Sequence, residues 1–293
     1  MFVVAGANGS TGGAVARALL AEGHPVRVLL RSDRNAEQWR AAGAEVAVAD
    51  VRDASSLTDA FLGAHGVYVL NPPPYTIDDM FAETRMVTAA YRGALAATGA
   101  RAVVLSSIGA QLPKGTGNIF TAHIMESELA ELDATFVRPG NFMTNWLGDT
   151  EALGNGVLPS FLDLDRPIPN VAPEDIAAIV VRELLSTGTR VVELAGPVDY
   201  TARQIADGFG SALGHPVKAE AIPREQWSTA LRTGFGIPAA AVATWEELWD
   251  GMNSGHIRFE GTPERGRVTI EEFAARTIGR STLTAIEPGR LDP

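Results

Sequence analysis

Short β-branched and apolar runs, bounded by Gly, Asn or Asp, alternate with longer stretches of mixed polarity through about two-thirds of the chain. Runs of this length and composition are typical of buried strands that end in loops. They predict strands near residues 2–5, 25–30, 45–49, 66–70, 101–106, 134–138 and 190–194.

The stretches between these runs have helical periodicity. Val15, Ala18 and Leu19 fall at positions i, i+3 and i+4, and Gly23 followed by Pro25 ends the helix that they indicate. Similar patterns predict helices near residues 35–42, 54–62, 77–98 and 120–132. Strands that alternate with helices form parallel sheets with right-handed crossovers, so we expect an α/β fold with a doubly wound parallel sheet.

The alternation stops after Gly196-Pro197. Helical segments follow near residues 201–213, 223–234, 238–253 and 270–279. The region 140–172 is rich in Gly, Pro, Asn and Asp, and its irregularity suits a wall over the sheet better than a core element. We therefore expect the sheet domain at residues 1–198 and a smaller, mostly helical substrate-side lobe with a tail at residues 199–293.

Composition excludes several classes of function. The 293 residues carry a formal charge of −11 and include no cysteine, which excludes disulfides, cysteine-held metals and a thiolate nucleophile. The negative charge disfavours nucleic-acid binding. The apolar run Ile176 to Val181 is far shorter than the roughly 18 to 20 residues of a membrane helix. Without a signal-peptide pattern at the start, we expect a cytoplasmic protein that binds neither nucleic acid nor membrane.

A glycine-rich loop directly follows the first strand and leads into a helix. Gly6, Gly9 and Gly12 have the G-x-x-G-x-x-G spacing. The first glycine permits a tight turn, the second a close backbone approach to a pyrophosphate, and the third close packing of helix on strand. An ordinary strand-to-helix turn is the alternative interpretation. We expect a dinucleotide here, held by the loop residues Gly6, Asn8, Gly9, Ser10, Thr11 and Gly12.

The end of the second strand predicts which dinucleotide binds. Arg31 is the first residue past the apolar run, where a guanidinium can pair with a 2′-phosphate, so NADP(H) is preferred over NAD(H). Asp33 leaves NAD(H) as an alternative cofactor. Arg31 could equally be a surface arginine without a ligand role. After the third strand, Asp50 could accept the adenine amino group while Val51 packs on the ring, although Asp50 could also cap a turn.

These motifs together resemble the NmrA-like group of atypical short-chain dehydrogenase/reductases. The resemblance continues through Leu105-Ser106-Ser107, His123-x-x-Glu126, the segment from Arg138-Pro139-Gly140 to Asn145, and Ala172 to Ile176. It implies a Rossmann-like domain with a small substrate lobe. It also implies that the nicotinamide lies near Asn71-Pro72-Pro73, Ser106 and Pro139, with Asn71, Pro72 and Pro139 among the cofactor-binding residues.

The chain departs from the wider family in its proton donor. Short-chain dehydrogenases usually carry Tyr-x-x-x-Lys, but the only two lysines, Lys114 and Lys218, follow Ala110 and Gly214 at that spacing. His123 is a candidate donor, since an imidazole titrates near pH 6.5, and Glu126 could orient it. Ser106 is the second catalytic candidate. Both His123 and Ser106 could instead be structural, as a half-exposed polar residue and a turn-forming serine.

Two classes of function follow. The first is an NADPH-dependent oxidoreductase that transfers hydride to a small conjugated acceptor such as a quinone, enone or imine, with Phe142 and Trp146 lining a substrate pocket or packing in the core. The second is a non-catalytic NADP(H) sensor that binds a protein partner. A redox-neutral biosynthetic enzyme is a third possibility. No metal site is expected, since no His-x-x-x-His occurs, and we expect a monomer or homodimer.

Overall fold

The computed structural model describes residues 1–72 and 77–281, so Pro73 and the expected tail lie outside the described residues. Within these ranges, eight strands form one parallel sheet in the order β13-β10-β6-β5-β4-β1-β2-β3. Their bounds are β1 Phe2–Ala5, β2 Val26–Leu30, β3 Glu45–Val48, β4 Gly66–Val69, β5 Arg101–Leu105, β6 Ala134–Pro139, β10 Val191–Ala195 and β13 Glu264–Arg265. The doubly wound, Rossmann-like sheet is confirmed, and only β13 was not predicted.

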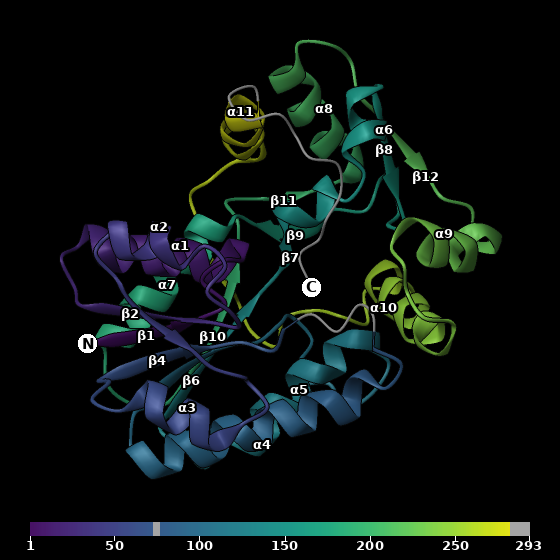
Figure 1. Cartoon of the computed structure of the whole chain (residues 1–293). Coiled ribbons are helices and arrows are strands. Elements are labelled where there is room, and N and C mark those ends of the chain that lie inside the picture. The colour runs from purple at the N-terminus through teal and green to yellow at the C-terminus, as the bar shows by residue number, and fades with distance from the viewer. Residues whose placement is uncertain (73–76, 282–293) are drawn as a thin grey trace.

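Helices cover both faces of this sheet (Figure 1). One layer contains α1 (Ser10–Ala21), α2 (Ala36–Ala41) and α7 (Pro173–Leu185), and the other contains α3 (Ala54–Phe61), α4 (Met80–Thr98) and α5 (Phe120–Leu129). Alternating side chains of each strand supply the two cores, as Val4 faces the first layer and Val3 the second. Burial of both faces explains why the strands read as continuous apolar runs.

A third hydrophobic core joins residues 143–168 to residues 200–274. It includes the predicted C-terminal helices, observed as α8 (Ala202–Leu213), α9 (Trp227–Gly234), α10 (Val242–Ser254) and α11 (Ile270–Ser281). The irregular region contributes β7 (Asn141–Phe142), η2 (Met143–Leu147), α6 (Thr150–Gly154), β8 (Val157–Ser160) and β9 (Ile168–Val171), and strands of this region pair with β11 (Asp199–Tyr200) and β12 (Lys218–Ala221). The helical C-terminal portion is confirmed, while the domain boundary at residue 198 stays a prediction.

Two glycines let β9 cross the carboxyl ends of β6 and β10. A Cβ on Gly140 would lie 2.5 Å from the Pro169 carbonyl oxygen, and one on Gly196 would lie 2.3 Å from that of Asn170. The Gly196 N–H also donates to the Asn170 carbonyl over 2.7 Å. Since no larger residue fits at these crossings, the smaller lobe is fixed above the edge where the strands end. No helix in the described ranges is long and apolar enough to span a membrane.

Candidate functional site

The glycine loop between β1 and α1 is shaped by backbone contacts. Gly6 has φ +65°, and its carbonyl accepts the Gly9 N–H over 2.9 Å. A Cβ on Gly12 would lie 2.3 Å from the Gly6 carbonyl oxygen and 2.5 Å from that of Ala5. The loop therefore depends on glycine at the first and third positions of the spacing, as predicted for a phosphate-binding turn.

The start of α1 is open to a ligand. Gly9 and Ser10 are exposed, and among the described residues no side chain caps this helix end. The first N–H groups of a helix carry partial positive charge and need an acceptor. Thr11, by contrast, is buried. A pyrophosphate fits this place, because its oxygens would accept these N–H groups.

Asn8 ties the loop to the segment after β2. Its side-chain amide donates to the Arg34 carbonyl over 3.3 Å, and its Oδ1 accepts the Trp39 indole N–H over 3.0 Å. The structure thus gives Asn8 a positioning role within the protein, and a direct contact with cofactor stays a prediction. The same contacts hold the loop beside the stretch that carries Arg31.

Arg31 and Asp50 follow β2 and β3 on the same edge as the glycine loop. Both are exposed, and the three strands are neighbours in the sheet. Asp50 Oδ1 accepts the Arg52 N–H over 2.9 Å. Asp50 therefore caps a turn, the second of the two roles considered from the sequence, and contact with adenine stays a prediction. Val51 is half-buried against the α3 and α4 core. We call Gly6–Gly12, Arg31 and Asp50 the phosphate-side edge.

Asn71 and Pro72 follow β4 at the middle of the sheet, and both are half-buried. The Asn71 amide donates to Thr84 Oγ1 over 3.0 Å, which turns its buried Oδ1 away from any hydrogen-bond donor in the described chain. An unpaired buried acceptor is costly unless a ligand supplies the donor. This observation agrees with the predicted role of Asn71 in cofactor binding.

Beyond β4, a buried ionic network lies under the ends of β5 and β6. Glu126 of α5 accepts three hydrogen bonds, from Ser106 Oγ over 2.5 Å, from Arg138 Nε over 2.8 Å and from Arg138 Nη2 over 2.6 Å. Arg138 Nη1 also donates to Glu260 over 3.1 Å and lies 3.8 Å from Glu193. We call Ser106, Glu126, Arg138, Glu193 and Glu260 the Arg138 network.

The network sets one guanidinium against three carboxylates, of which Glu260 is 70% exposed, and hydrogen bonds stabilise the two that are buried. The side chains of Arg138, Glu126 and Glu193 are only 7%, 12% and 9% exposed. Glu193 accepts the backbone N–H groups of Glu260 and Gly261 over 2.7 and 2.8 Å. Burial opposes the charged guanidinium, but Glu126 and then Glu260 raise the pKa of Arg138 above its ordinary value.

His123 is oriented by a different partner from the one that the sequence indicated. Its Nδ1 lies 2.8 Å from the Ala110 carbonyl oxygen, and its half-buried ring stacks on Phe120 with centroids 5.2 Å apart. Glu126 is held by Arg138 and Ser106, so the expectation that it orients His123 was wrong. The physical reason is the bidentate fork of Arg138, which a single imidazole N–H cannot match.

Two tyrosines near the strand ends cannot replace the missing Tyr-x-x-x-Lys pair. Tyr68 and Tyr91 are fully buried, and burial raises the pKa of both phenols well above the usual value. The Tyr91 hydroxyl donates to the Leu70 carbonyl over 3.2 Å. Neither phenol is accessible to a substrate, so neither can deliver it a proton.

The two predicted substrate aromatics lie where β6 continues into the smaller lobe. Pro139 ends β6 and is buried. Phe142 is half-buried against the α1 and α7 core. Trp146 is 7% exposed, and its indole N–H donates over 2.8 Å to Asn170 Oδ1. The structure therefore places Trp146 in the core of the lobe, and contact of either aromatic with substrate stays a prediction.

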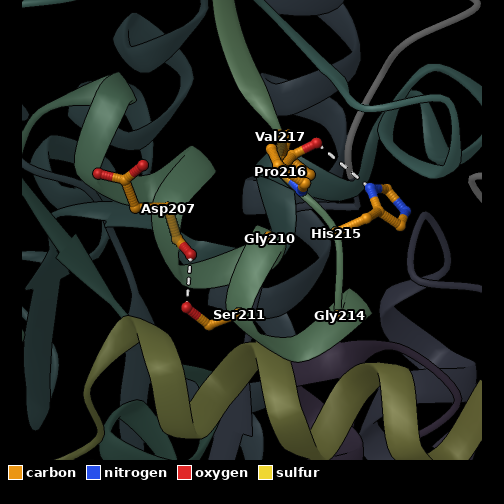
Figure 2. A pocket seen from close by; sticks show the side chains of 7 residues that line it. All are labelled: Asp207, Gly210, Ser211, Gly214, His215, Pro216 and Val217. Carbon is orange, nitrogen blue, oxygen red and sulfur yellow. Dashed lines mark hydrogen bonds between the residues drawn. The ribbon is translucent and has the colours of Figure 1, made fainter.

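Other parts of the described surface present fewer groups that could bind a ligand. A shallow depression at the end of α8 is lined by Asp207, Gly210, Ser211, Gly214, His215, Pro216 and Val217 (Figure 2). Its Ser211 hydroxyl and His215 ring are bonded to nearby backbone carbonyls. In residues 1–72 and 77–281, no three His, Asp or Glu side chains group so as to hold a metal ion.

Comparison with known proteins gives one family. Residues 1–254 match the NmrA-like family. A (4-alkanoyl-5-oxo-2,5-dihydrofuran-3-yl)methyl phosphate reductase of Streptomyces griseus is 32% identical over 246 residues, which are 82% of this chain and 83% of the relative.

Two solved structures share the fold over nearly their whole length. An NADPH-dependent quinone oxidoreductase of Escherichia coli, complexed with NADPH, has a TM-score of 0.69 at 23% identity and covers 95% of this chain and 100% of its own. NmrA, a negative transcriptional regulator in complex with NADP, has a TM-score of 0.70 at 17% identity and covers 98% of both chains.

Proposed function

The chain belongs to the NmrA-like family, and on this premise we propose that it is an NADPH-dependent oxidoreductase that transfers hydride to a small conjugated acceptor of the quinone, enone or imine type. The observation that carries the proposal is the phosphate-side edge. There an exposed helix start without a side-chain cap lies next to the exposed Arg31, at the ends of adjacent strands.

The residues of this edge suit NADPH by their chemistry. The N–H groups at the start of α1 would bind the pyrophosphate, and Arg31 would bind the 2′-phosphate. Asp33, the residue that would favour NAD(H), is exposed and lies 3.8 Å from Arg40. The nicotinamide half would then lie along the ends of β4, β5 and β6, beside Asn71, Ser106 and Pro139.

Hydride transfer requires the protein mainly to orient the cofactor and the acceptor. When bound, NADPH supplies the hydride, and a reduced quinone or enone takes up one further proton from solvent or a side chain. Because the Ala110 carbonyl can only accept, it holds a hydrogen on His123 Nδ1, which leaves Nε2 as the ring atom that exchanges a proton. We assign this proton to His123, which donates only in its imidazolium form.

Two relatives support the acceptor class. The Streptomyces protein is a reductase of an alkanoyl-oxo-dihydrofuran phosphate, and the Escherichia coli neighbour is a quinone oxidoreductase. Conjugated acceptors of this kind accept hydride without a phenol to polarise a carbonyl group. They therefore agree with a chain in which Tyr-x-x-x-Lys does not occur.

Titration of NADPH and NADH tests the cofactor assignment. We expect Arg31→Ala to weaken NADPH about tenfold, roughly 1.4 kcal/mol, while NADH is unchanged, because only NADPH carries the 2′-phosphate. Arg92→Ala, which removes an exposed arginine paired with Glu131, is the matched control and should not change the preference. Equal losses for both nucleotides in Arg31→Ala would contradict the 2′-phosphate role.

A panel of small quinones and enones then tests turnover. Oxidation of NADPH with at least one of them supports the reductase. Tight NADPH binding without turnover on any acceptor would favour the alternatives, an NADP(H) sensor like the regulatory neighbour or a redox-neutral enzyme. Failure to bind either nucleotide would refute the proposal.

A further inference from the structure

Under the proposed function, Ser106 lies beside the nicotinamide half of the cofactor. It directly follows β5, between the ends of β4 and β6, and it is only 6% exposed. A hydroxyl that activates a carbonyl substrate must donate its hydrogen to the carbonyl oxygen. The direction of the Ser106 hydroxyl therefore decides which acceptors the site can activate.

The Arg138 network determines that direction. Arg138 is cationic at all ordinary pH and donates two hydrogen bonds to Glu126 in a fork, over 2.8 and 2.6 Å. A carboxylate held in this way has only lone pairs to offer. Its contact with Ser106 Oγ over 2.5 Å is therefore a bond that the serine donates.

Resting on the proposed function, we propose that Glu126, positioned by Arg138, takes the only hydrogen of the Ser106 hydroxyl, so that Ser106 acts toward a ligand as an acceptor and not as a donor. The site then cannot polarise a carbonyl through Ser106. It selects acceptors that take hydride without such help, and simple ketones and aldehydes are poor substrates for this reason.

The inference makes Glu126 a positioning residue whose substitution should change substrate preference. A glutamine would keep an oxygen that can accept from Ser106, so the informative change is Glu126→Leu, which removes the acceptor. Arg138 keeps its bond to Glu260 over 3.1 Å in this variant. The hydrogen of Ser106 is then released for a substrate carbonyl.

The kinetic experiment compares kcat/KM for an aliphatic aldehyde with that for a quinone. We expect Glu126→Leu to raise the aldehyde-to-quinone ratio at least fivefold, and Ser106→Ala in the same background to abolish the rise. Glu264→Leu is the matched control, because Glu264 is also held by an arginine fork, from Arg182 over 2.7 and 2.9 Å, but receives no bond from a serine within the described chain. An unchanged ratio in Glu126→Leu overturns the inference, as does loss of aldehyde reduction in Ser106→Ala alone.

A neutron structure of the unaltered protein tests the same inference without any turnover. A deuteron on Ser106 Oγ directed at Glu126 Oε1 supports it, and a deuteron directed away from Glu126 overturns it. This measurement decides the hydroxyl direction even if the substituted chains do not fold. It also separates the two proposals, because a chain that reduces no acceptor would refute the reductase and leave the deuteron position unchanged.

Discussion

The two halves of the sheet edge are built in different ways. At the phosphate-side edge, backbone geometry and glycine spacing shape the loop, and Gly9, Ser10, Arg31 and Asp50 are exposed. At the Arg138 network, one guanidinium is surrounded by three carboxylates from different elements and is buried with two of them. The first region can change its ligand contacts at little cost to the fold, whereas the second cannot, because two buried carboxylates depend on one guanidinium.

The largest expected effect is on stability, at the Arg138 network. Arg138→Ala would leave Glu126 and Glu193 buried without their cation, which costs about 3–5 kcal/mol of unfolding free energy. Urea unfolding measures this loss. Arg203→Ala removes an arginine from the exposed pair with Asp165, where about 0–1 kcal/mol is expected. Equal losses in the two variants would show that the network contributes no more than a surface ion pair.

Substitution in the phosphate-side edge should instead reduce the affinity for NADPH. In Gly12→Ala, the new Cβ would lie 2.3 Å from a backbone oxygen that cannot move without opening the loop. We expect NADPH affinity to fall at least 100-fold, about 2.7 kcal/mol, in a titration. Gly154→Ala is the control, because a Cβ added there would meet no atom of another element within 4 Å and the φ of Gly154 is not positive. Undiminished affinity in Gly12→Ala would refute the close approach of loop and helix.

The same contrast explains what the sequence could predict. The glycine loop and the place of Arg31 after β2 were predictable because their signals are local and follow strands with clear apolar runs. β13 was missed because two residues, Glu264 and Arg265, carry no periodicity. Glu126 was assigned to His123 from helical spacing, since its true partner, Arg138, comes from the next strand. Spacing within one helix cannot reveal a stronger donor on another element.

The partners of Arg138 show more generally which contacts a local sequence pattern cannot predict. Arg138 belonged to a recognised motif, but nothing in the sequence marked Glu193 or Glu260 as its neighbours. Glu193 reaches it because β10 pairs with β6, with Glu193 in register with Arg138. Glu260 reaches it because the chain returns from the smaller lobe before β13. Contacts of this kind depend on strand order, which no local pattern encodes.

His123 lies on α5, the helix that also carries Glu126, and its substitution should affect rate alone. His123→Gln should lower kcat with a quinone about tenfold, less than the usual range for a general acid, because water can also protonate the product. Single-turnover kinetics with a quinone measure this loss. An unchanged kcat in His123→Gln would assign the proton to solvent.

The smallest expected effect is on NADPH affinity, at Asn8 in the phosphate-side edge. Asn8→Ala removes the bonds to the Arg34 carbonyl and the Trp39 indole, and leaves the helix N–H groups in place. If Asn8 only positions the loop, NADPH affinity should fall about threefold, below about 1 kcal/mol, a size typical of one net hydrogen bond. Trp39→Phe removes the indole bond from its other side and should give a similar loss in titration. A tenfold or greater loss in Asn8→Ala alone would instead mean that Asn8 contacts the cofactor directly, because Trp39→Phe would not reproduce it.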